Sequence, residues 1–297
     1  MTLNPLKSLL LVAAALGAAP AFATLQATYT LVTNTHEQIV KRGGEVGSSA
    51  SALSFTDSLS ASSAAGAALR NDVQVQAVYG GLRGSVSSSV KGAGDSESPN
   101  ANGSFQSVWS DTLTVASSTL AYGTPVTFSG VMYLHASYGL SATTTPIFPY
   151  MVATFYQEDL YVNSTTTSGS VAHIVYRSDY DQTMNFGGTR NTVTTVPFTV
   201  TSSVGDTLHL QMVLEGATSA SAYPGGSASA YLDAGHTGML TLALDTPGAS
   251  YTTLSGTDYT NFVYAPVPEP ASAVLLLAGL AGLVAAGRRR LQTPQQP

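Results

Sequence analysis

The sequence predicts an all-β fold, an antiparallel β-sandwich with a jelly-roll-like arrangement, flanked by an N-terminal signal peptide and a C-terminal transmembrane helix. Short runs rich in Val, Thr, Tyr and Phe recur between clusters of Gly, Pro, Ser and Asn, as in strands separated by turns. The 3.6-residue period of amphipathic helices is almost absent between the two ends. Apolar segments with the features of targeting signals stand at both ends of the chain.

The clearest strand is Val73–Tyr79, in which apolar and polar residues alternate strictly before a turn at Gly80-Gly81. The same mixture of β-branched, aromatic and polar residues predicts eight more strands. These are Phe105–Val115, Val126–Ser137, Tyr150–Val162, Val171–Arg177, Val193–Val200, Thr207–Leu214, Ala228–Leu232 and Met239–Leu244. Many short strands with turn signals between them are typical of a sandwich, so we expect one β-sandwich domain over residues 24–264.

Two intervals are rich in small residues and carry no clear strand pattern. Gly43–Ala68 and Gly92–Gly103 consist largely of Ser, Ala, Gly and Asn, whose side chains bury little area. Each is expected to be a flexible loop or an edge strand. Only Ser62–Arg70 has any helical signal.

The composition of the body limits its partners. The 297-residue chain has 9% charged residues and no cysteine. Between Thr24 and Val267 it has seven Lys and Arg against sixteen Asp and Glu, a net charge of −9. Nucleic acid is not an expected partner, because phosphate neutralisation requires a basic stripe. Without disulfides, an exported body must be stabilised by its core, a metal or assembly.

The N-terminus has the three parts of a secretory signal peptide. Lys7 supplies the positive charge, Ser8–Ala19 is apolar, and Ala21 and Ala23 form an A-x-A cleavage site. We expect residues 1–23 to direct export by the Sec machinery, with cleavage after Ala23.

The C-terminal region, residues 265–297, also has three parts in order: Pro268-Glu269-Pro270, the uncharged segment Ala271–Gly287, and Arg288-Arg289-Arg290. As a helix, the uncharged segment would rise about 26 Å, near the lower limit for spanning a bilayer core. The arginines would remain in the cytoplasm by the positive-inside rule, which leaves the body outside. A permanent single-span anchor is the alternative interpretation of these residues.

The string VPEPASAVLLLAGLAGLVAAGRRR resembles the PEP-CTERM sorting signal of Gram-negative bacteria. The resemblance implies that an exosortase recognises Pro268, Glu269 and Pro270, that the helix holds an inner-membrane intermediate before processing, and that Arg288, Arg289 and Arg290 stop transfer. The protein would then pass to the cell envelope or outside the cell.

The end of the body is also similar to the closing half of many PEP-CTERM proteins. That half has a G-D-x-L-x-L strand, an Ala/Ser-rich strand, a T-x-x-L-x-L strand and a Y-x-x-x-S-G-x-x-Y ending. The matching segments are Val204–Leu210, Ser219–Ala230, Gly238–Leu244 and Tyr251–Tyr259. This pattern is architectural, and it implies no activity.

No catalytic motif is present in the sequence. The five histidines are not spaced at i, i+2 or i+4, and no G-x-S-x-G motif occurs. His173 and His209 are expected at outward positions of strands. The densest acidic pairs are Glu158-Asp159 and Asp179 with Asp181, for which a solvated loop or edge is the main interpretation. Either pair could also supply the two carboxyl groups of a glycosidase, and Asp179 and Asp181 could bind calcium; we predict no other cofactor or metal.

Five of the fifteen tyrosines lie close together in the sequence and could stack on sugar rings: Tyr133, Tyr138, Tyr150, Tyr156 and Tyr161. Such tyrosines also occur as core residues. The sequence therefore favours a non-enzymatic envelope or matrix protein, with a carbohydrate-binding module for exopolysaccharide as the alternative.

Overall fold

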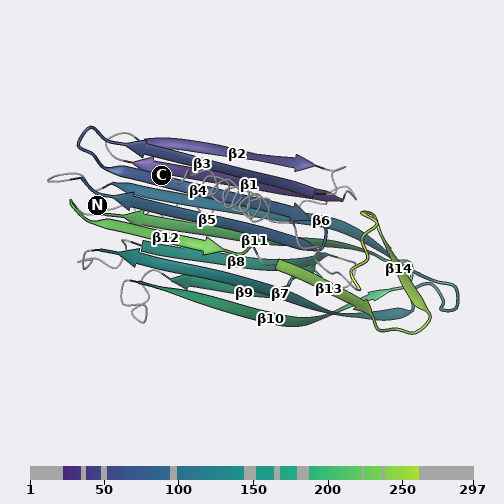
Figure 1. The fold of residues 1–297 in the computed structure, drawn as a ribbon. Coiled ribbons are helices and arrows are strands. Elements are labelled where there is room, and N and C mark those ends of the chain that lie inside the picture. The colour runs from purple at the N-terminus through teal and green to yellow at the C-terminus, as the bar shows by residue number, and fades with distance from the viewer. Residues whose placement is uncertain are drawn as a thin grey trace, which may run out of the picture. The chain divides into compact units, whose positions relative to one another are not determined.

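The computed structural model describes residues 23–34, 38–47, 52–93, 99–143, 152–163, 168–178, 187–222, 224–235 and 238–260. In these ranges the chain forms fourteen strands in two antiparallel sheets and no helix, which confirms the all-β class (Figure 1). The chain divides into two compact units: one runs to Phe262, and the other comprises residues 263–297.

The first sheet, sheet A, has the strand order β2-β1-β6-β11-β8-β9, and β14 pairs with β6 beside this path. Its strands are β1 (Thr24–Asn34), β2 (Gln38–Gly47), β6 (Asn100–Ser117), β8 (Val152–Asn163), β9 (Ser168–Ser178), β11 (Thr207–Ser221) and β14 (Ala249–Thr253). β1 begins at Thr24, the residue that follows the predicted signal cleavage site.

The second sheet, sheet B, has the order β10-β7-β12-β5-β4-β3, and β13 pairs with β5 and β7. Its strands are β3 (Ala52–Ser62), β4 (Ala68–Val78), β5 (Gly81–Lys91), β7 (Pro125–Ala142), β10 (Gly187–Ser203), β12 (Ser227–Asp233) and β13 (Gly238–Leu244). The chain combines hairpins within a sheet with crossings between the two sheets. Its jelly-roll-like connectivity stays a prediction.

Each of the nine predicted strands overlaps an observed one. The Gly43–Ala68 interval contributes the terminal strand of sheet B, β3, so its edge-strand interpretation is confirmed. The helical signal at Ser62–Arg70 is wrong, because a turn closed by the Ser63 and Gly66 amides leads directly into β4. Gly66 has a φ of 93°, which suits glycine and is incompatible with a helix.

The core lies between the two sheets and is filled by alternate residues of the strands. Its main cluster, the aromatic cluster, includes Trp109, Phe128, Tyr156 and Tyr259 among many Leu and Val side chains. Glycine makes room for one ring: a Cβ at Gly84 or at Gly216 would overlap the ring of Phe105. Replacing either glycine would therefore displace a buried aromatic side chain.

A second, smaller cluster fills the part of the core where β6 begins and β11 ends. This alanine cluster consists of Leu69, Val90, Ala101, Leu140, Ala220, Ala222, Ala228 and Ala230. Because five of its eight members are alanine, it buries much less apolar area per residue than the aromatic cluster.

Polar side chains join the two sheets near the alanine cluster. Asn71 Nδ2 donates to the Val32 carbonyl at 2.9 Å, and the Ser88 hydroxyl donates to Asn71 Oδ1 at 2.7 Å. Ser88 Oγ also lies 2.8 Å from Thr218 Oγ1. Since Val32 and Thr218 belong to sheet A while Asn71 and Ser88 belong to sheet B, this network fixes the two sheets relative to each other.

Within the described ranges, no helix has the length and apolar character that a membrane span requires. The predicted transmembrane segment, Ala271–Gly287, lies outside those ranges. So do residues 1–22 of the predicted signal peptide.

Candidate functional site

Several residues singled out from the sequence lie outside the described ranges. These are the sorting residues Pro268, Glu269, Pro270, Arg288, Arg289 and Arg290, the cleavage-site residue Ala21, and the calcium candidates Asp179 and Asp181. Their predicted roles stay predictions. In the described ranges, no group of three or more His, Cys, Asp or Glu side chains could hold a metal ion.

The acidic pair in β8 does not lie at a solvated edge, so that prediction is wrong. β8 is flanked on both sides by β11 and β9, and Glu158 is fully buried while Asp159 is 4% exposed. The two side chains point to opposite faces of sheet A because neighbouring residues of a strand alternate. They therefore cannot act together as a pair of catalytic carboxyls.

Glu158 points into the core. Its register partners are Leu214 and Ile174, and its Oε1 occupies the space that a Cβ at Gly238 would fill. Neither carboxyl oxygen has a hydrogen-bond partner in the part of the chain that the structure describes. Burial, and secondarily the Asp159 charge, raises the pKa of Glu158 well above its ordinary value, so that the neutral acid is favoured.

Asp159 points to the outer face of sheet A. It contacts His173 Nδ1 and accepts a hydrogen bond from Gln157. Nearby, the Gln106 amide donates to Glu215 at 2.5 Å. Burial first, and then the charges of Asp159 and Glu215, raises the pKa of the Tyr161 hydroxyl. The cluster is a set of satisfied cross-strand contacts.

His173 and His209 are predicted at outward positions of strands. Both side chains are exposed at such positions, which confirms the prediction. His173 is directly opposite Asp159 on β9, and its side chain is 51% exposed. His209 Nδ1 lies 3.1 Å from the Thr112 hydroxyl of the neighbouring strand.

The five neighbouring tyrosines do not form one binding face. Tyr138 and Tyr156 are buried in the core, and Tyr150 lies outside the described ranges. Tyr133 and Tyr161 are half-buried on different sheets. A stacking platform made from this group is therefore not formed.

The last part of the body is fastened by a buried carboxylate, Asp111, which the sequence did not single out. Asp111 Oδ1 accepts from the amides of Thr112 and Ser255 at 2.7 and 3.1 Å. Its Oδ2 accepts from the hydroxyls of Ser255 and Tyr259 at 2.5 and 2.7 Å. The Tyr259 ring stacks on Trp109, with ring centroids 5.4 Å apart. Asp111, Ser255, Tyr259 and Trp109 form what we call the C-terminal latch.

The latch explains the Y-x-x-x-S-G-x-x-Y pattern. Tyr251 donates to the Leu242 carbonyl at 3.1 Å, and Ser255 and Tyr259 bind Asp111. Burial first, and then the Asp111 charge, raises the pKa of Tyr259 well above its ordinary value, so this hydroxyl remains a donor at neutral pH. The pattern therefore closes the domain immediately before the tail.

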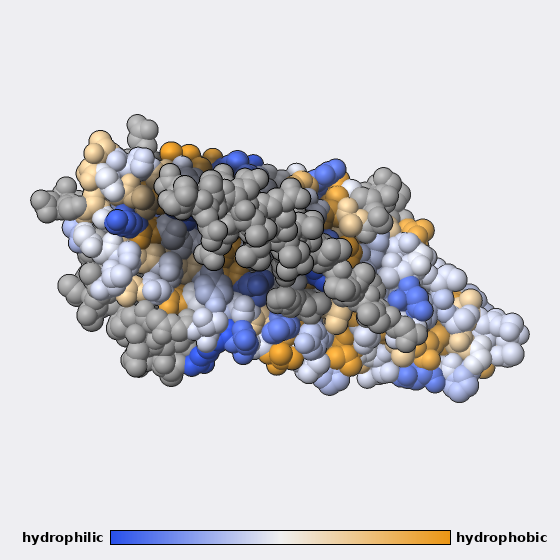
Figure 2. Space-filling model, viewed as in Figure 1, coloured by the Kyte–Doolittle hydropathy of each residue, from blue (hydrophilic) through white to orange (hydrophobic). Residues whose placement is uncertain are grey.

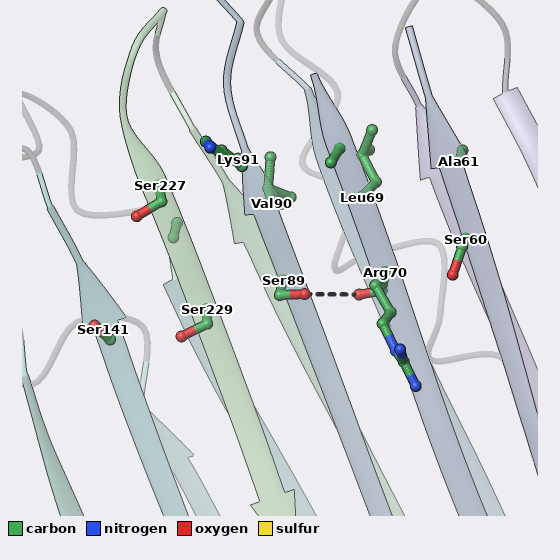
Figure 3. Close-up of a pocket in the computed structure, with 12 residues that line it drawn as sticks. Ser60, Ala61, Leu69, Arg70, Ser89, Val90, Lys91, Ser141, Ser227 and Ser229 are labelled. Atoms are coloured by element: carbon green, nitrogen blue, oxygen red, sulfur yellow. Dashed lines mark hydrogen bonds between the residues drawn. The ribbon is translucent and has the colours of Figure 1, made fainter. Parts of the chain in front are cut away.

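The outer face of sheet B carries a groove of about 490 Å³. Five side chains lie in register across five adjacent strands and line it: Ser60 (β3), Arg70 (β4), Ser89 (β5), Ser229 (β12) and Ser141 (β7). Figure 3 shows these side chains on successive strands, with a hydrogen bond from the Ser89 hydroxyl to the Arg70 carbonyl. We refer to the five as the lateral row.

Two positively charged side chains, Arg70 and Lys91, line this groove. Arg70 forms a bidentate pair with Asp72 on its own strand, at 2.8 to 3.0 Å, which fixes the direction of the guanidinium. Lys91 is exposed at the end of β5, beside Ser227 of β12. None of the twelve residues that line the groove is acidic.

An aromatic side chain lies beside the lateral row. Tyr231 is two residues after Ser229 on β12 and is paired with Gly139 of β7. Its hydroxyl donates to Thr189 Oγ1 of β10 at 3.1 Å, so the side chain crosses β7 at the glycine. The sequence signal of this face is the alternation of Ser85, Ser87 and Ser89 with buried residues of β5.

A second groove, of about 620 Å³, is lined by residues of β7, β10 and β13 and by Thr260. Its lining includes Pro197, Phe198 and Thr241 and contains no charged side chain. Over the face seen in Figure 2, most described residues are near neutral in hydropathy, and blue and orange patches are scattered among them. Of the two grooves, only the one with Arg70 and Lys91 is lined by charged side chains.

Comparison with known proteins identifies the tail. The family model of the PEP-CTERM protein-sorting motif matches residues 266–290. No curated protein matches the chain. Among solved structures, one of infectious bursal disease virus strain Gx aligns with 10% identity over 94% of this chain and 75% of that chain. Its TM-score is 0.10, so it carries no argument about the fold. The tail therefore carries a PEP-CTERM protein-sorting motif, which confirms the resemblance drawn from it.

Proposed function

We propose that this protein is a non-enzymatic component of the cell envelope or extracellular matrix, exported by the Sec machinery and released from the membrane by an exosortase. The observation that carries this proposal is the sorting motif at residues 266–290. The motif implies export and a membrane-associated intermediate, and both agree with a cysteine-free, sparsely charged body.

The latch supports the proposal that the body folds independently of the sorting tail. Tyr259 is the last residue bound to Asp111, and eight residues separate it from Pro268. Nine residue steps span at most about 30 Å when fully extended. A linker of this length would let a membrane protease act on the sorting motif while the latch stays closed.

The β8 acids support a non-enzymatic role. Glu158 is enclosed in the core, and Asp159 is engaged by Gln157 and His173 on the opposite face. A glycosidase requires two carboxyl groups facing one substrate. In the described ranges, this densest acidic pair cannot meet that requirement.

Intact-mass measurement of the protein from its native envelope and medium tests the sorting step. We expect a mass that begins at Thr24 and ends near Pro268–Pro270, and retention of the full tail in cells that lack the exosortase. The variant Glu269→Ala should keep the tail, whereas the exposed control Glu45→Ala should be processed normally. A mature mass that includes Arg288–Arg290 would mean that the tail is a lasting anchor.

A second candidate function is binding of exopolysaccharide by the outer face of sheet B. The observation that favours it is the lateral row, because four hydroxyls and a guanidinium supply donors and acceptors along one groove. This surface replaces the tyrosine cluster as the place where a sugar chain would bind. Binding and a matrix role are compatible, since a matrix protein must contact the matrix.

A further inference from the structure

We propose that the groove on sheet B binds an acidic polysaccharide, one whose sugar units carry carboxylate groups, laid across the strands along the lateral row. This inference rests on the second candidate function and names the class of glycan.

The geometry of the row suits a polymer with a short repeat. Ser60, Arg70, Ser89, Ser229 and Ser141 are register partners from strand to strand. Adjacent strands are about 4.8 Å apart, so successive side chains present polar groups at nearly the length of one sugar ring. A chain that crosses the strands would meet one polar side chain for about every sugar unit.

The charges of the groove favour acidic units. The body carries a net charge of −9 with only seven Lys and Arg, yet Arg70 and Lys91 both line this groove and no acid does. Asp72 binds the Nε and one terminal amino group of Arg70, which leaves other guanidinium N–H groups directed away from this pair. Lys91 is exposed and has no ion-pair partner among the described residues.

The tyrosine beside the row provides an apolar surface. The Tyr231 ring is held by the bond of its hydroxyl to Thr189 and crosses the strand at Gly139. A ring fixed in this way can contact the apolar face of a sugar with little loss of side-chain entropy on binding. The sheet face that carries the groove therefore combines hydroxyls, cations and an aromatic ring beside the row.

The test uses the full chain in detergent micelles, with a polyuronate, a neutral glucan of the same length and vesicles of anionic lipid as probes. We expect the polyuronate to bind most tightly, and binding to weaken in about 1 M salt, where charges are screened beyond about 3 Å. Lys91→Glu should weaken polyuronate binding about three- to tenfold, because it reverses one exposed charge. Arg42→Glu, a matched reversal on the edge strand of sheet A, should leave binding unchanged.

A neutral variant tests the position of the site. Ser89 is exposed at the centre of the row, so Ser89→Phe should block the groove while the melting temperature stays within the range of the other variants. Loss of binding in this variant, with Ser54→Phe on the same face as the unaffected control, supports the groove.

The failures of the two proposals are distinguishable. Equal binding of neutral glucan and polyuronate, with Lys91→Glu unaffected, would overturn the acidic class and leave glycan binding intact. No binding of either glycan would overturn both. Equal effects of Arg42→Glu and Lys91→Glu, or equal binding to the vesicles, would show general attraction of anions and overturn the groove assignment.

Discussion

The two ends of the sandwich core are held together in different ways. β6 runs through both: Ala101 belongs to the alanine cluster, whereas Trp109 belongs to the aromatic cluster and stacks on Tyr259. At the Trp109 end, large side chains bury apolar area and Asp111 fastens the last segment. At the Ala101 end, small side chains contribute less, and the Asn71, Ser88 and Thr218 network joins the sheets.

The two ends of the core support two different features of the molecule, the C-terminal latch and the groove on sheet B. The aromatic end closes the domain where the chain leaves for its sorting tail. The alanine end lies beneath the groove, because Leu69, Val90 and Ala228 belong to the alanine cluster and also line the groove. One end therefore serves the stability of the terminus, and the other supports an open surface.

The largest effect is expected at the latch. Asp111→Ala removes four hydrogen bonds and leaves the buried Tyr259 hydroxyl and the half-buried donors of Ser255 without this partner, which should cost about 3 kcal/mol. Urea unfolding measures the loss of stability. Limited proteolysis should also show earlier cleavage between Ala249 and Thr260.

The control for this change is Tyr259→Phe, which keeps the ring against Trp109 and removes one hydrogen bond. It should cost about 1 kcal/mol. If Asp111→Ala costs no more than Tyr259→Phe, Asp111 is not the centre of the latch.

An intermediate effect is expected from overfilling the alanine end. Ala220 is fully buried on β11 and belongs to the alanine cluster, so the three carbons that Ala220→Leu adds must be accommodated inside the core. Overpacking of this kind costs about 2 kcal/mol. The free energy of unfolding, measured in urea, should fall by that amount.

Ala52→Leu serves as the matched control, because Ala52 is exposed on β3 and the added carbons meet solvent. This variant should change stability by less than about 0.5 kcal/mol. A silent Ala220→Leu would mean that the alanine cluster is loosely packed, and the contrast between the two ends would then be false.

Apolar residues at the inward positions make a strand such as β4 predictable, although β1, with Leu25, Ala27 and Leu31 at inward positions, is not among the predicted strands. β4 alternates Val73, Val75 and Ala77 with polar residues, and its strand was evident. β5 was missed because buried Gly84 and Ser88 interrupt its apolar series of Leu82, Val86 and Val90. A buried glycine or serine cannot be told from an exposed one without the neighbouring strands.

The candidate sites depend on contacts between distant strands. The lateral row requires the register of five strands, and the latch joins Asp111 to a residue 148 positions later in the chain. Neither relation has a local sequence signal. Glu158 was misplaced for a related reason, since a carboxyl group in a strand normally faces water and only the position of β8 between β9 and β11 shows that it does not.

The last prediction concerns the pH dependence of stability and depends on Glu158, a buried carboxyl group whose register partners are Leu214 and Ile174. The pKa of Glu158 in the folded chain is raised. Below the ordinary value of 4.5, Glu158 is protonated in both the folded and the unfolded chain, so it does not make the stability depend on pH. Above that value the unfolded chain loses a proton that the folded chain retains. The wild-type protein should therefore lose up to about 1.4 kcal/mol of stability per pH unit until the folded carboxyl also ionises.

Glu158→Gln removes this titration, so the slope of stability against pH above about pH 5 should become flatter. The slope is the decisive quantity, since a buried amide without a partner has a pH-independent cost of its own. Melting temperatures at several pH values measure it, with the exposed Glu45→Gln as the control that should keep the wild-type slope. If Glu158→Gln keeps that slope as well, Glu158 is ionised in the folded protein. The aromatic end must then contain a charge or a water molecule that stabilises the carboxylate, since Leu214 and Ile174 are apolar and do not.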